Sequence, residues 1–357
     1  MRKYFIDNLR WMAVLMLFPY HIFMIYNSFG EEFYIKGADI PLTTGFIVVA
    51  GRWLMPLLFA IAGISSAFAL QKRSCAQYLK ERVRKLLIPF IFGVLLIIPP
   101  QTFFADKFHN EFAGNYFDNY TLFFTRLNDY ITFNIGFTPA HLWFLLYLFI
   151  ISLVALPLMK IFKNSGKKLP LHKLPFFLLL VLFIIPWLAS PVLDISGKSL
   201  GEFFVFFIFG YFILSDNSIL ERAEKYRFIL LSISVFCTAF LLIAWIWLLE
   251  LNLIHDIVYD IFFRFYAWIT VLTLLGLFKH YFNSRNKVSD YFLSSSFAVY
   301  LFHQTWIIIT AYYTFMLTNN AALQIAIILI TSVITTFASF ELCRRLSGTR
   351  FMFGIKK

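Results

Sequence analysis

Charged residues are scarce in this sequence. Asp, Glu, Lys and Arg together make up 14% of its 357 residues, which is too few to cover the surface of a soluble domain of that size. Hydrophobic residues make up 60%, and they occur in runs of about 20 residues, the length that crosses the hydrocarbon core of a bilayer. The composition therefore excludes a water-soluble protein and predicts one that spans a membrane.

Cysteine is scarce too, and the motifs of several enzyme classes are missing. Cys75, Cys237 and Cys343 are far apart and have no paired spacing, so we expect small core residues rather than disulfides or metal ligands. The sequence contains no His-x-x-x-His pair, no Gly-x-Ser-x-Gly motif and no nucleotide-binding loop. These absences predict no bound metal and no permanently bound cofactor.

Acidic residues are outnumbered, because 19 Asp and Glu stand against 31 Lys and Arg, a formal net charge of +12. No basic stretch carries a nucleic-acid-binding motif or interleaved aromatic residues, so nucleic acid is not an expected partner. The cations lie instead in alternate loops between the apolar runs. On the cation-poor side the loops hold only Lys36, Lys107, Arg126 and Lys198, so the positive-inside rule places both termini in the cytoplasm.

The apolar runs predict about ten transmembrane helices. We place them at roughly 6–27, 44–70, 86–104, 141–162, 174–190, 200–215, 227–250, 258–279, 291–316 and 321–342. The expected fold is an all-α polytopic bundle in the inner membrane of the cell. Residues 1–345 would form the membrane domain, and residues 346–357 a short basic cytoplasmic tail.

Three arginines lie inside or at the edge of predicted spans, namely Arg10, Arg52 and Arg264. A charge near the bilayer centre costs roughly 2.5–3.5 kcal/mol on insertion scales, so we expect the bundle to enclose a polar interior. For Arg52 and Arg264, one interpretation is the binding of an oxyanion or an anionic substrate. The other is an ion pair with an outer-loop carboxylate, for which the candidates are Glu250, Asp256 and Asp260.

Arg10 and His21 are expected to share one face of the first span. Eleven residues at about 100° each come within about 20° of three full turns, and they separate the two side chains by about 16 Å. An arginine near the cytoplasmic end can bind phosphate or a carbonyl oxygen, and a deeper histidine can act as a general base. The alternative is a buried helix-packing pair in which Arg10 reaches back to the interface.

Two more histidines lie in predicted spans. His303, on the ninth span, lies about 18 Å from the cytoplasmic end, which matches the predicted depth of His21. His141 opens the fourth span beside Trp143, where a histidine by itself is often an interface anchor.

A basic segment precedes the third span and carries Arg82, Arg84 and Lys85. It would attract anionic lipid headgroups, which is a common role for such segments. It would equally attract the phosphates of a cytosolic acyl-CoA, and the sequence does not separate these two ligands.

Taken together, these segments resemble acyltransferase family 3, a family of membrane proteins that includes glycan O-acylating enzymes and proteins of periplasmic glucan succinylation. The matching segments follow one another along nearly the whole chain: Asp7-Asn8-Leu9-Arg10 with His21, Arg52 to Phe59 leading to Gly63, Arg82 to Leu87 followed by Pro89, His141 to Leu145, Phe206 to Tyr211, and Tyr300 to His303. The chain departs from the family at Lys85, where a second arginine is usual, and so loses one bidentate donor.

The resemblance implies transfer of an acyl group, acetyl or succinyl in class, from cytosolic acyl-CoA to a hydroxyl of an extracytoplasmic glycan or glycolipid. His21 would act as general base or carry the acyl group, while Arg52 and His303 would polarise or position the reacting carbonyl. The residues implied to bind the donor are Arg10, Arg82, Arg84 and Lys85, and His141 and Arg264 are further candidates for substrate binding.

A transporter or exporter of a glycan or small polar solute is the competing hypothesis, because it would use the same intramembrane polar residues as a pathway. Transporters built from inverted repeats show paired broken helices in their two halves, and no such pair is evident in this sequence. A donor-dependent enzyme also explains the cytoplasmic basic segment.

Overall fold

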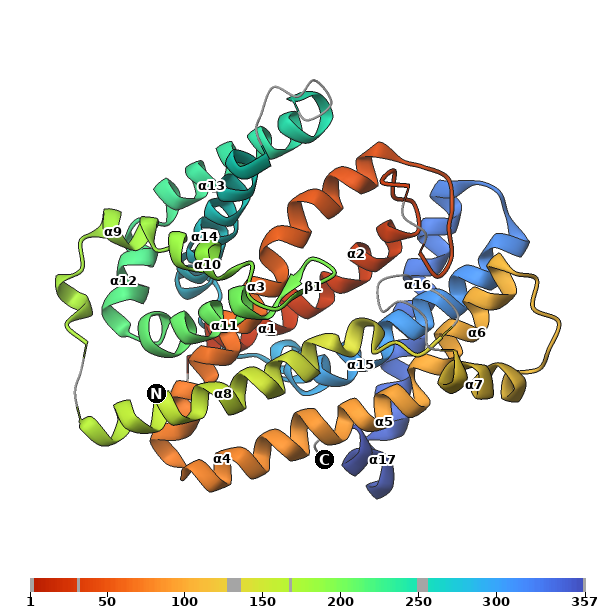
Figure 1. Ribbon diagram of the computed structural model, residues 1–357, viewed down its shortest axis with the longest axis horizontal. Coiled ribbons are helices and arrows are strands. Elements are labelled where there is room, and N and C mark those ends of the chain that lie inside the picture. The colour runs from red at the N-terminus through yellow and green to blue at the C-terminus, as the bar shows by residue number, and fades with distance from the viewer. Residues whose placement is uncertain (1–2, 31–32, 127–135, 167–168, 249–255, 356–357) are drawn as a thin grey trace. The chain divides into compact units, whose positions relative to one another are not determined.

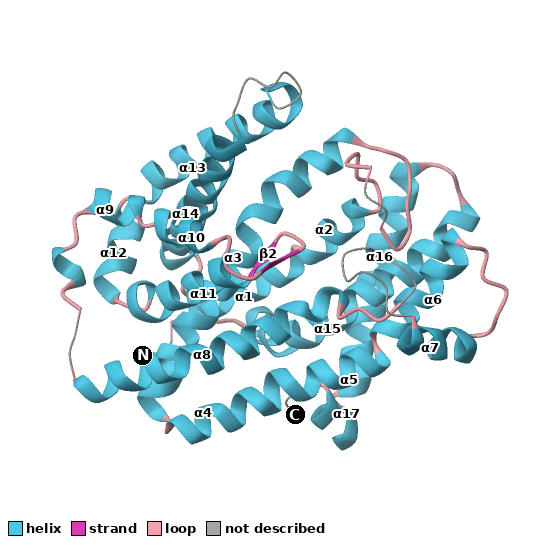
Figure 2. Cartoon of the chain, viewed as in Figure 1, coloured by secondary structure: helices cyan, strands magenta, loops and turns pink. Residues whose placement is uncertain are grey.

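The computed structural model describes residues 3–30, 33–126, 136–166, 169–248 and 256–355. These residues are almost entirely helical, and the described strands are limited to β1 (Asp194–Ile195) and β2 (Lys198–Ser199), which pair antiparallel in a short hairpin (Figure 2). The prediction of an all-α protein is therefore confirmed. The chain divides into two compact units, each assembled from segments that are far apart in the sequence.

The first unit comprises Met1–Ala13, Val48–Glu81 and Leu148–Ser289. The elements that lie wholly or mainly in it are α1 (Tyr4–Leu15), α3 (Pro41–Lys72), α4 (Cys75–Arg82), α8 (Trp143–Ser165), η3 (Leu171–Lys173), α9 (Phe176–Val181), α10 (Ile184–Ala189), β1, β2, α11 (Leu200–Phe209), η4 (Gly210–Leu214), α12 (Asn217–Lys225), α13 (Arg227–Ile243), η5 (Ala244–Leu248) and α14 (Asp256–Tyr281) (Figure 1).

The second unit comprises Val14–Ile47, Arg82–Tyr147 and Asp290–Lys357. The elements that lie wholly or mainly in it are α2 (Leu17–Met24), η1 (Val83–Leu87), α5 (Ile88–Leu96), α6 (Ile98–His109), α7 (Tyr116–Thr125), η2 (Ala140–Leu142), α15 (Lys287–Leu317), α16 (Ala321–Cys343) and α17 (Ser347–Met352). The predicted boundary between a membrane domain and a tail at residue 345 stays a prediction.

Seven helical stretches among the described residues are long and apolar enough to cross a membrane, and an eighth is possible if the bent pair α11–η4 and α12 forms one span. The chain is thus a polytopic membrane protein, as predicted, but the count of about ten spans is not confirmed. The predicted span 174–190 corresponds to the shorter apolar stretch Phe176–Ala189. The predicted span 6–27 is divided between α1 and α2.

Proline explains two of the helix breaks. Pro19 has no N–H, so the Leu15 carbonyl lacks its usual donor four residues later, and α1 ends at Leu15. In the same way, Pro100 leaves the carbonyl of Leu96 without a donor, and α5 ends there. Both breaks therefore follow from local sequence.

Glycine allows two helices of the first unit to pack with their backbones in contact. A Cβ atom on Gly63 of α3 would collide with the carbonyl of Phe207, and one on Gly210 would collide with the carbonyl of Ala60. Helices in lipid gain little from hydrophobic burial against each other, so small residues that allow close approach stabilise their association. Gly63 and Gly210 thus allow the close packing of these helices.

Candidate functional site

Three histidines converge in the second unit, although they come from distant parts of the chain. The ring centroids of His21 and His303 lie 5.2 Å apart, and those of His141 and His303 lie 5.1 Å apart. His21 lies on α2, His141 on η2 directly before α8, and His303 near the middle of α15. His303 is 0% exposed and His141 7% exposed, whereas His21 is partly exposed, so this histidine cluster is a largely buried polar site.

Hydrogen bonds to the backbone determine which nitrogen of each buried ring carries hydrogen. Nδ1 of His303 lies 3.1 Å from the Val299 carbonyl and 2.9 Å from the Tyr300 carbonyl. A carbonyl oxygen only accepts, so Nδ1–H is the donor and Nε2 of the neutral ring has a free lone pair. His141 uses the opposite nitrogen, because its Nε2 donates to the Leu301 carbonyl at 3.0 Å.

Three of the other ring nitrogens are buried without hydrogen-bond partners among the described residues. They are Nδ1 of His21, Nδ1 of His141 and Nε2 of His303. Buried polar atoms are normally paired, and an unpaired one calls for a ligand, water or a catalytic role. The cluster therefore offers lone pairs to a group that donates a hydrogen bond, such as a hydroxyl.

The histidine cluster is bordered by the ring of Phe33 and by the side chains of two glutamines, Gln101 and Gln304. Phe33 stacks on His21 with ring centroids 6.2 Å apart, and its carbonyl accepts a 2.8 Å hydrogen bond from Nε2 of His109. Beside His303, Gln304 donates to Gln101 Oε1 at 3.2 Å, while its own buried Oε1 has no partner in the described part of the chain. Sequence reasoning assigned no role to either glutamine.

No group of three or more His, Cys, Asp or Glu side chains in the described ranges is arranged to hold a metal ion. This finding includes the histidine cluster, whose rings contact one another edge-on or tilted. The imidazole rings of the cluster can supply acid–base or nucleophilic chemistry.

Arg10 belongs to the first unit and contacts Ser65 of α3, two residues after Gly63. Its Nη2 donates to Ser65 Oγ at 2.5 Å, and its Nη1 lies 3.6 Å from the carboxylate of Asp7. Ser65 in turn donates to the Ile61 carbonyl at 2.8 Å, so the serine orients the guanidinium. Because Arg10 and His21 fall in different units, their shared helix face stays a prediction.

Arg52 and Arg264 lie on the same ring in the first unit. Their guanidinium carbons are 4.2 Å and 4.5 Å from the centroid of Phe263, a favourable cation–π arrangement. Arg264 also pairs with Glu202 at 3.2 Å and with Asp260. The ion-pair interpretation therefore holds for Arg264, with Asp260 as one predicted partner and Glu202 as one that the sequence did not reveal.

Arg52 differs from Arg264, because its guanidinium has no ion pair or hydrogen bond among the described residues. Glu250 lies outside those residues, as does the side chain of Asp256. For Arg52, both interpretations therefore remain, namely the binding of an anion and an ion pair with a carboxylate. For Arg264, two carboxylates already offset the charge.

The predicted donor-binding residues lie on a widened helical turn. η1 is a π-helix over Val83–Leu87, in which the Ile88 N–H bonds to the Val83 carbonyl. Pro89 has no N–H to offer to Lys85, which favours the wider turn. Arg82, at the end of α4, and Lys85 are partly buried, whereas Arg84 is exposed, so the turn presents cations at the surface of the second unit.

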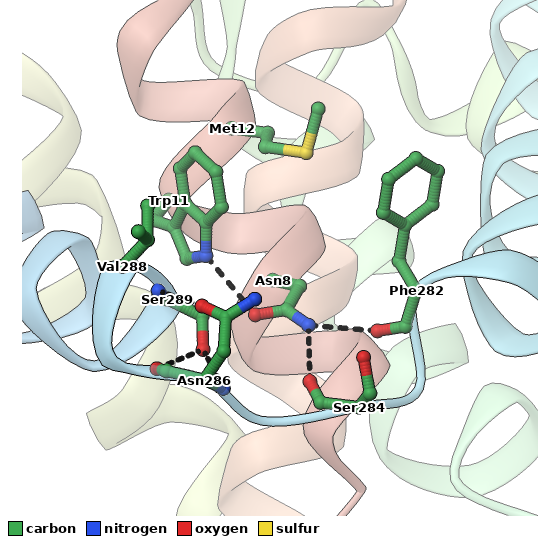
Figure 3. Close-up of a pocket in the computed structure, with 8 residues that line it drawn as sticks. All are labelled: Asn8, Trp11, Met12, Phe282, Ser284, Asn286, Val288 and Ser289. Carbon is green, nitrogen blue, oxygen red and sulfur yellow. Dashed lines mark hydrogen bonds between the residues drawn. The ribbon is translucent and has the colours of Figure 1, made fainter.

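A pocket of about 230 Å³ lies in the first unit between α1 and the loop that precedes α15 (Figure 3). Its wall includes Trp11, Met12 and Phe282, and Asn8 holds the loop by donating to the carbonyls of Phe282 and Ser284 at 2.7 and 3.0 Å. The Trp11 indole completes this network by donating to Asn8 Oδ1 at 3.1 Å. These partnered polar atoms anchor the loop and offer no obvious catalytic group.

Comparison with known proteins gives one family and several distant relatives. A family model described as an acyltransferase domain, that of acyltransferase family 3, matches residues 3–341. Glucans biosynthesis protein C of Escherichia coli strain K12 is 25% identical over 169 residues, which cover 46% of this chain and 40% of that protein. The same protein from strain SMS-3-5 / SECEC is also 25% identical over 169 residues. The match thus spans less than half the length of these relatives, and no solved structure matches the chain.

Proposed function

Because this chain belongs to acyltransferase family 3, we propose that it moves an acyl group from a cytosolic donor to a hydroxyl of an extracytoplasmic glycan. The acyl group is of the acetyl or succinyl class, the donor is acyl-CoA and the acceptor is a glycan or glycolipid. The single observation that supports this chemistry best is the buried histidine cluster, with its three unpartnered ring nitrogens. Such nitrogens suit a reaction in which a hydroxyl loses its proton.

In the proposed reaction, the acceptor hydroxyl oxygen attacks the thioester carbonyl carbon. A C–O bond forms, the C–S bond breaks, His21 takes the hydroxyl proton, and the thiolate of the donor leaves and is then protonated. A two-step route, in which His21 first carries the acyl group, uses the same residues. His303 and His141, held by backbone carbonyls, position the hydroxyl, and Arg52 stabilises charge on the carbonyl oxygen.

On the donor side, Arg10, Arg82, Arg84 and Lys85 bind the phosphates or thioester of acyl-CoA. The positive-inside rule places these cations at the cytoplasmic face, where a cytosolic donor would arrive. Exposure of Arg84 on the π-turn supports this role. The relatives are named for glucan biosynthesis, which supports a glycan as acceptor, and we place the protein in the inner membrane.

The first experiment compares surface glycans from cells with and without this protein by mass spectrometry. Loss of an ester-linked acetyl or succinyl group on deletion, restored by the wild-type gene but not by a His21→Ala gene, supports the proposal and identifies the acyl group. Unchanged acylation in the deletion strain contradicts it.

A second experiment separates the enzyme from a transporter. Purified protein in lipid nanodiscs is titrated with acyl-CoA, and we expect the Arg82→Ala and Arg84→Ala variants to bind it more weakly. A transporter of glycans has no need of this ligand. Absence of any acyl-CoA binding by the wild type would therefore favour the transporter.

A further inference from the structure

The C-terminal segment of the second unit ends in a glycine-dependent cap. The N–H of Ile355 bonds to the Arg350 carbonyl at 3.0 Å, and the N–H of Gly354 bonds to the Phe351 carbonyl at 3.4 Å. This pair of bonds is the Schellman pattern, with Gly354 at φ +62° as the left-handed residue. The chain is thereby turned back sharply after α17.

The cap packs against the π-turn that carries the basic motif. A Cβ atom on Gly354 would lie 3.1 Å from Pro89 Cγ and 3.8 Å from the Arg84 carbonyl oxygen. Phe353, which is 6% exposed, makes an edge contact with Phe302 at a centroid distance of 5.2 Å. Phe302 directly precedes His303, so the segment touches both the basic turn and the helix of the histidine cluster.

This packing brings a C-terminal segment that carries cations against the basic turn, while the Arg350 guanidinium itself donates to the Arg344 carbonyl at 3.4 Å. Arg350 lies in the last turn of α17. The glycine cap that follows α17 lies against the backbone of Arg84. Arg344 and Arg345, which precede α17, are exposed. Arg344 pairs with Glu341 at 2.8 Å, and the exposed cations of the two segments favour the binding of an anion there.

We propose that α17 and its glycine cap complete one phosphate-binding surface together with Arg84 and Lys85 of the π-turn. This inference rests on the proposed function, and it deepens it by assigning donor binding to a segment beyond the family match, which ends at residue 341. The ligand is the phosphate part of the acyl donor. A phospholipid headgroup offers the same chemistry, and the experiment has to distinguish the two sources.

The test measures binding of coenzyme A to the full-length protein in nanodiscs made only of phosphatidylcholine, so that no anionic lipid competes. We expect Arg350→Gln to weaken binding roughly three- to tenfold, as for loss of one charge-assisted contact, and Arg350→Lys to restore most of it. Lys160→Gln, which removes an exposed cation of α8, is the matched control and should leave the Kd unchanged. Pantetheine, which lacks the phosphates, should not distinguish wild type from Arg350→Gln.

Three outcomes overturn the inference in different ways. If wild-type protein binds coenzyme A and Arg350→Gln binds it equally well, the C-terminal surface is wrong while the proposed function stands. If wild-type protein binds no coenzyme A, the donor assignment fails and this surface fails with it. If Arg350→Gln leaves coenzyme A binding unchanged and weakens only the retention of anionic lipid, the ligand is a lipid headgroup. This result also contradicts the proposal.

A variant that does not fold still leaves a test on the wild-type protein. Arginine modification by phenylglyoxal is followed by peptide mass spectrometry with and without coenzyme A. We expect coenzyme A to protect Arg84 and Arg350 but not Arg285, an exposed arginine of the first unit. Equal modification of all three with and without coenzyme A counts against the surface.

Discussion

His21 and His303 face each other with ring centroids 5.2 Å apart, and the buried Nδ1 of one and Nε2 of the other have no partner among the described residues. α2 and α15 are far apart in the sequence, so this contact exists only in the folded chain. It joins two residues that occur in separate family-like segments.

Removal of the His21 ring should abolish acyl transfer without preventing membrane insertion. A positioned base typically contributes about 10²–10⁴-fold in rate, so His21→Ala should lower the acylation rate by that order. Acylation is measured in membranes with matched amounts of protein. A well-expressed His21→Ala variant that acylates at the wild-type rate rules out this role.

In His303 and His141, one ring nitrogen donates to the backbone and the other has no partner among the described residues. An amide substitution can keep the first nitrogen and remove the second. In His303→Asn the amide nitrogen replaces the Nδ1 donor to the Val299 and Tyr300 carbonyls, whereas in His141→Gln it replaces the Nε2 donor to Leu301. Both variants should keep a near-wild-type Tm and lose at least tenfold in activity. The opposite exchanges, His303→Gln and His141→Asn, should also lower Tm, because each loses a buried side-chain hydrogen bond to the backbone of α15. Equal Tm values in the two sets would show that the backbone bonds do not orient the rings.

Glu202 should matter more for stability than Asp260, although both pair with Arg264. The side chains of Arg264 and Glu202 are 8% and 11% exposed, whereas that of Asp260 is 38% exposed. Loss of one partner from a buried ion pair costs roughly 3–5 kcal/mol, while an exposed pair contributes about 1 kcal/mol or less. Thermal unfolding in detergent should therefore show a larger drop in Tm for Glu202→Gln than for Asp260→Asn. The reverse order would mean that Asp260 is the main partner of Arg264.

A methyl group on Gly63 should destabilise the first unit. Its Cβ would meet the Phe207 carbonyl, which is backbone and cannot rotate away, and overpacking of this kind costs about 1–3 kcal/mol. Gly348 provides the control, because a Cβ there meets nothing within 4 Å. Gly63→Ala should lower Tm and Gly348→Ala should not, and a neutral Gly63→Ala variant would contradict the close approach of α3 and α11.

Stability should fall at acidic pH partly through Glu224, which lies between the predicted spans 200–215 and 227–250. A hydrogen bond from Lys279, supported by His280, holds the pKa of this carboxyl below its usual 4.5, although partial burial opposes the shift. Because the folded-state pKa lies below the unfolded one, ionised Glu224 stabilises the fold above pH 4.5, and this contribution is lost as the pH falls toward the folded pKa.

The corresponding measurement is Tm as a function of pH. Glu224→Gln removes the titrating group, so its Tm should depend less on pH below about 5 than that of the wild type. At pH 7 the variant should be slightly less stable, because Lys279 loses its ionised partner. Parallel pH profiles for the two proteins would show that Glu224 is not responsible.

Local sequence determined the class of this protein. Apolar runs of spanning length predicted a helical membrane protein, prolines accounted for the breaks after Leu15 and Leu96, and short motifs indicated the family. These properties depend on residues close together along the chain. The count of about ten spans was less secure, because composition does not show where a helix bends or stops short.

Only the tertiary structure decided which polar groups meet. It brought His21, His141 and His303 together in one unit, and it paired Arg264 with Glu202, which nothing in the sequence had singled out. It also laid the C-terminal cap against the basic turn. Such contacts join residues that are far apart in the sequence, 62 positions in the case of Arg264 and Glu202. The spacing of side chains along one helix carries no information about neighbouring helices, so packing alone determined these contacts.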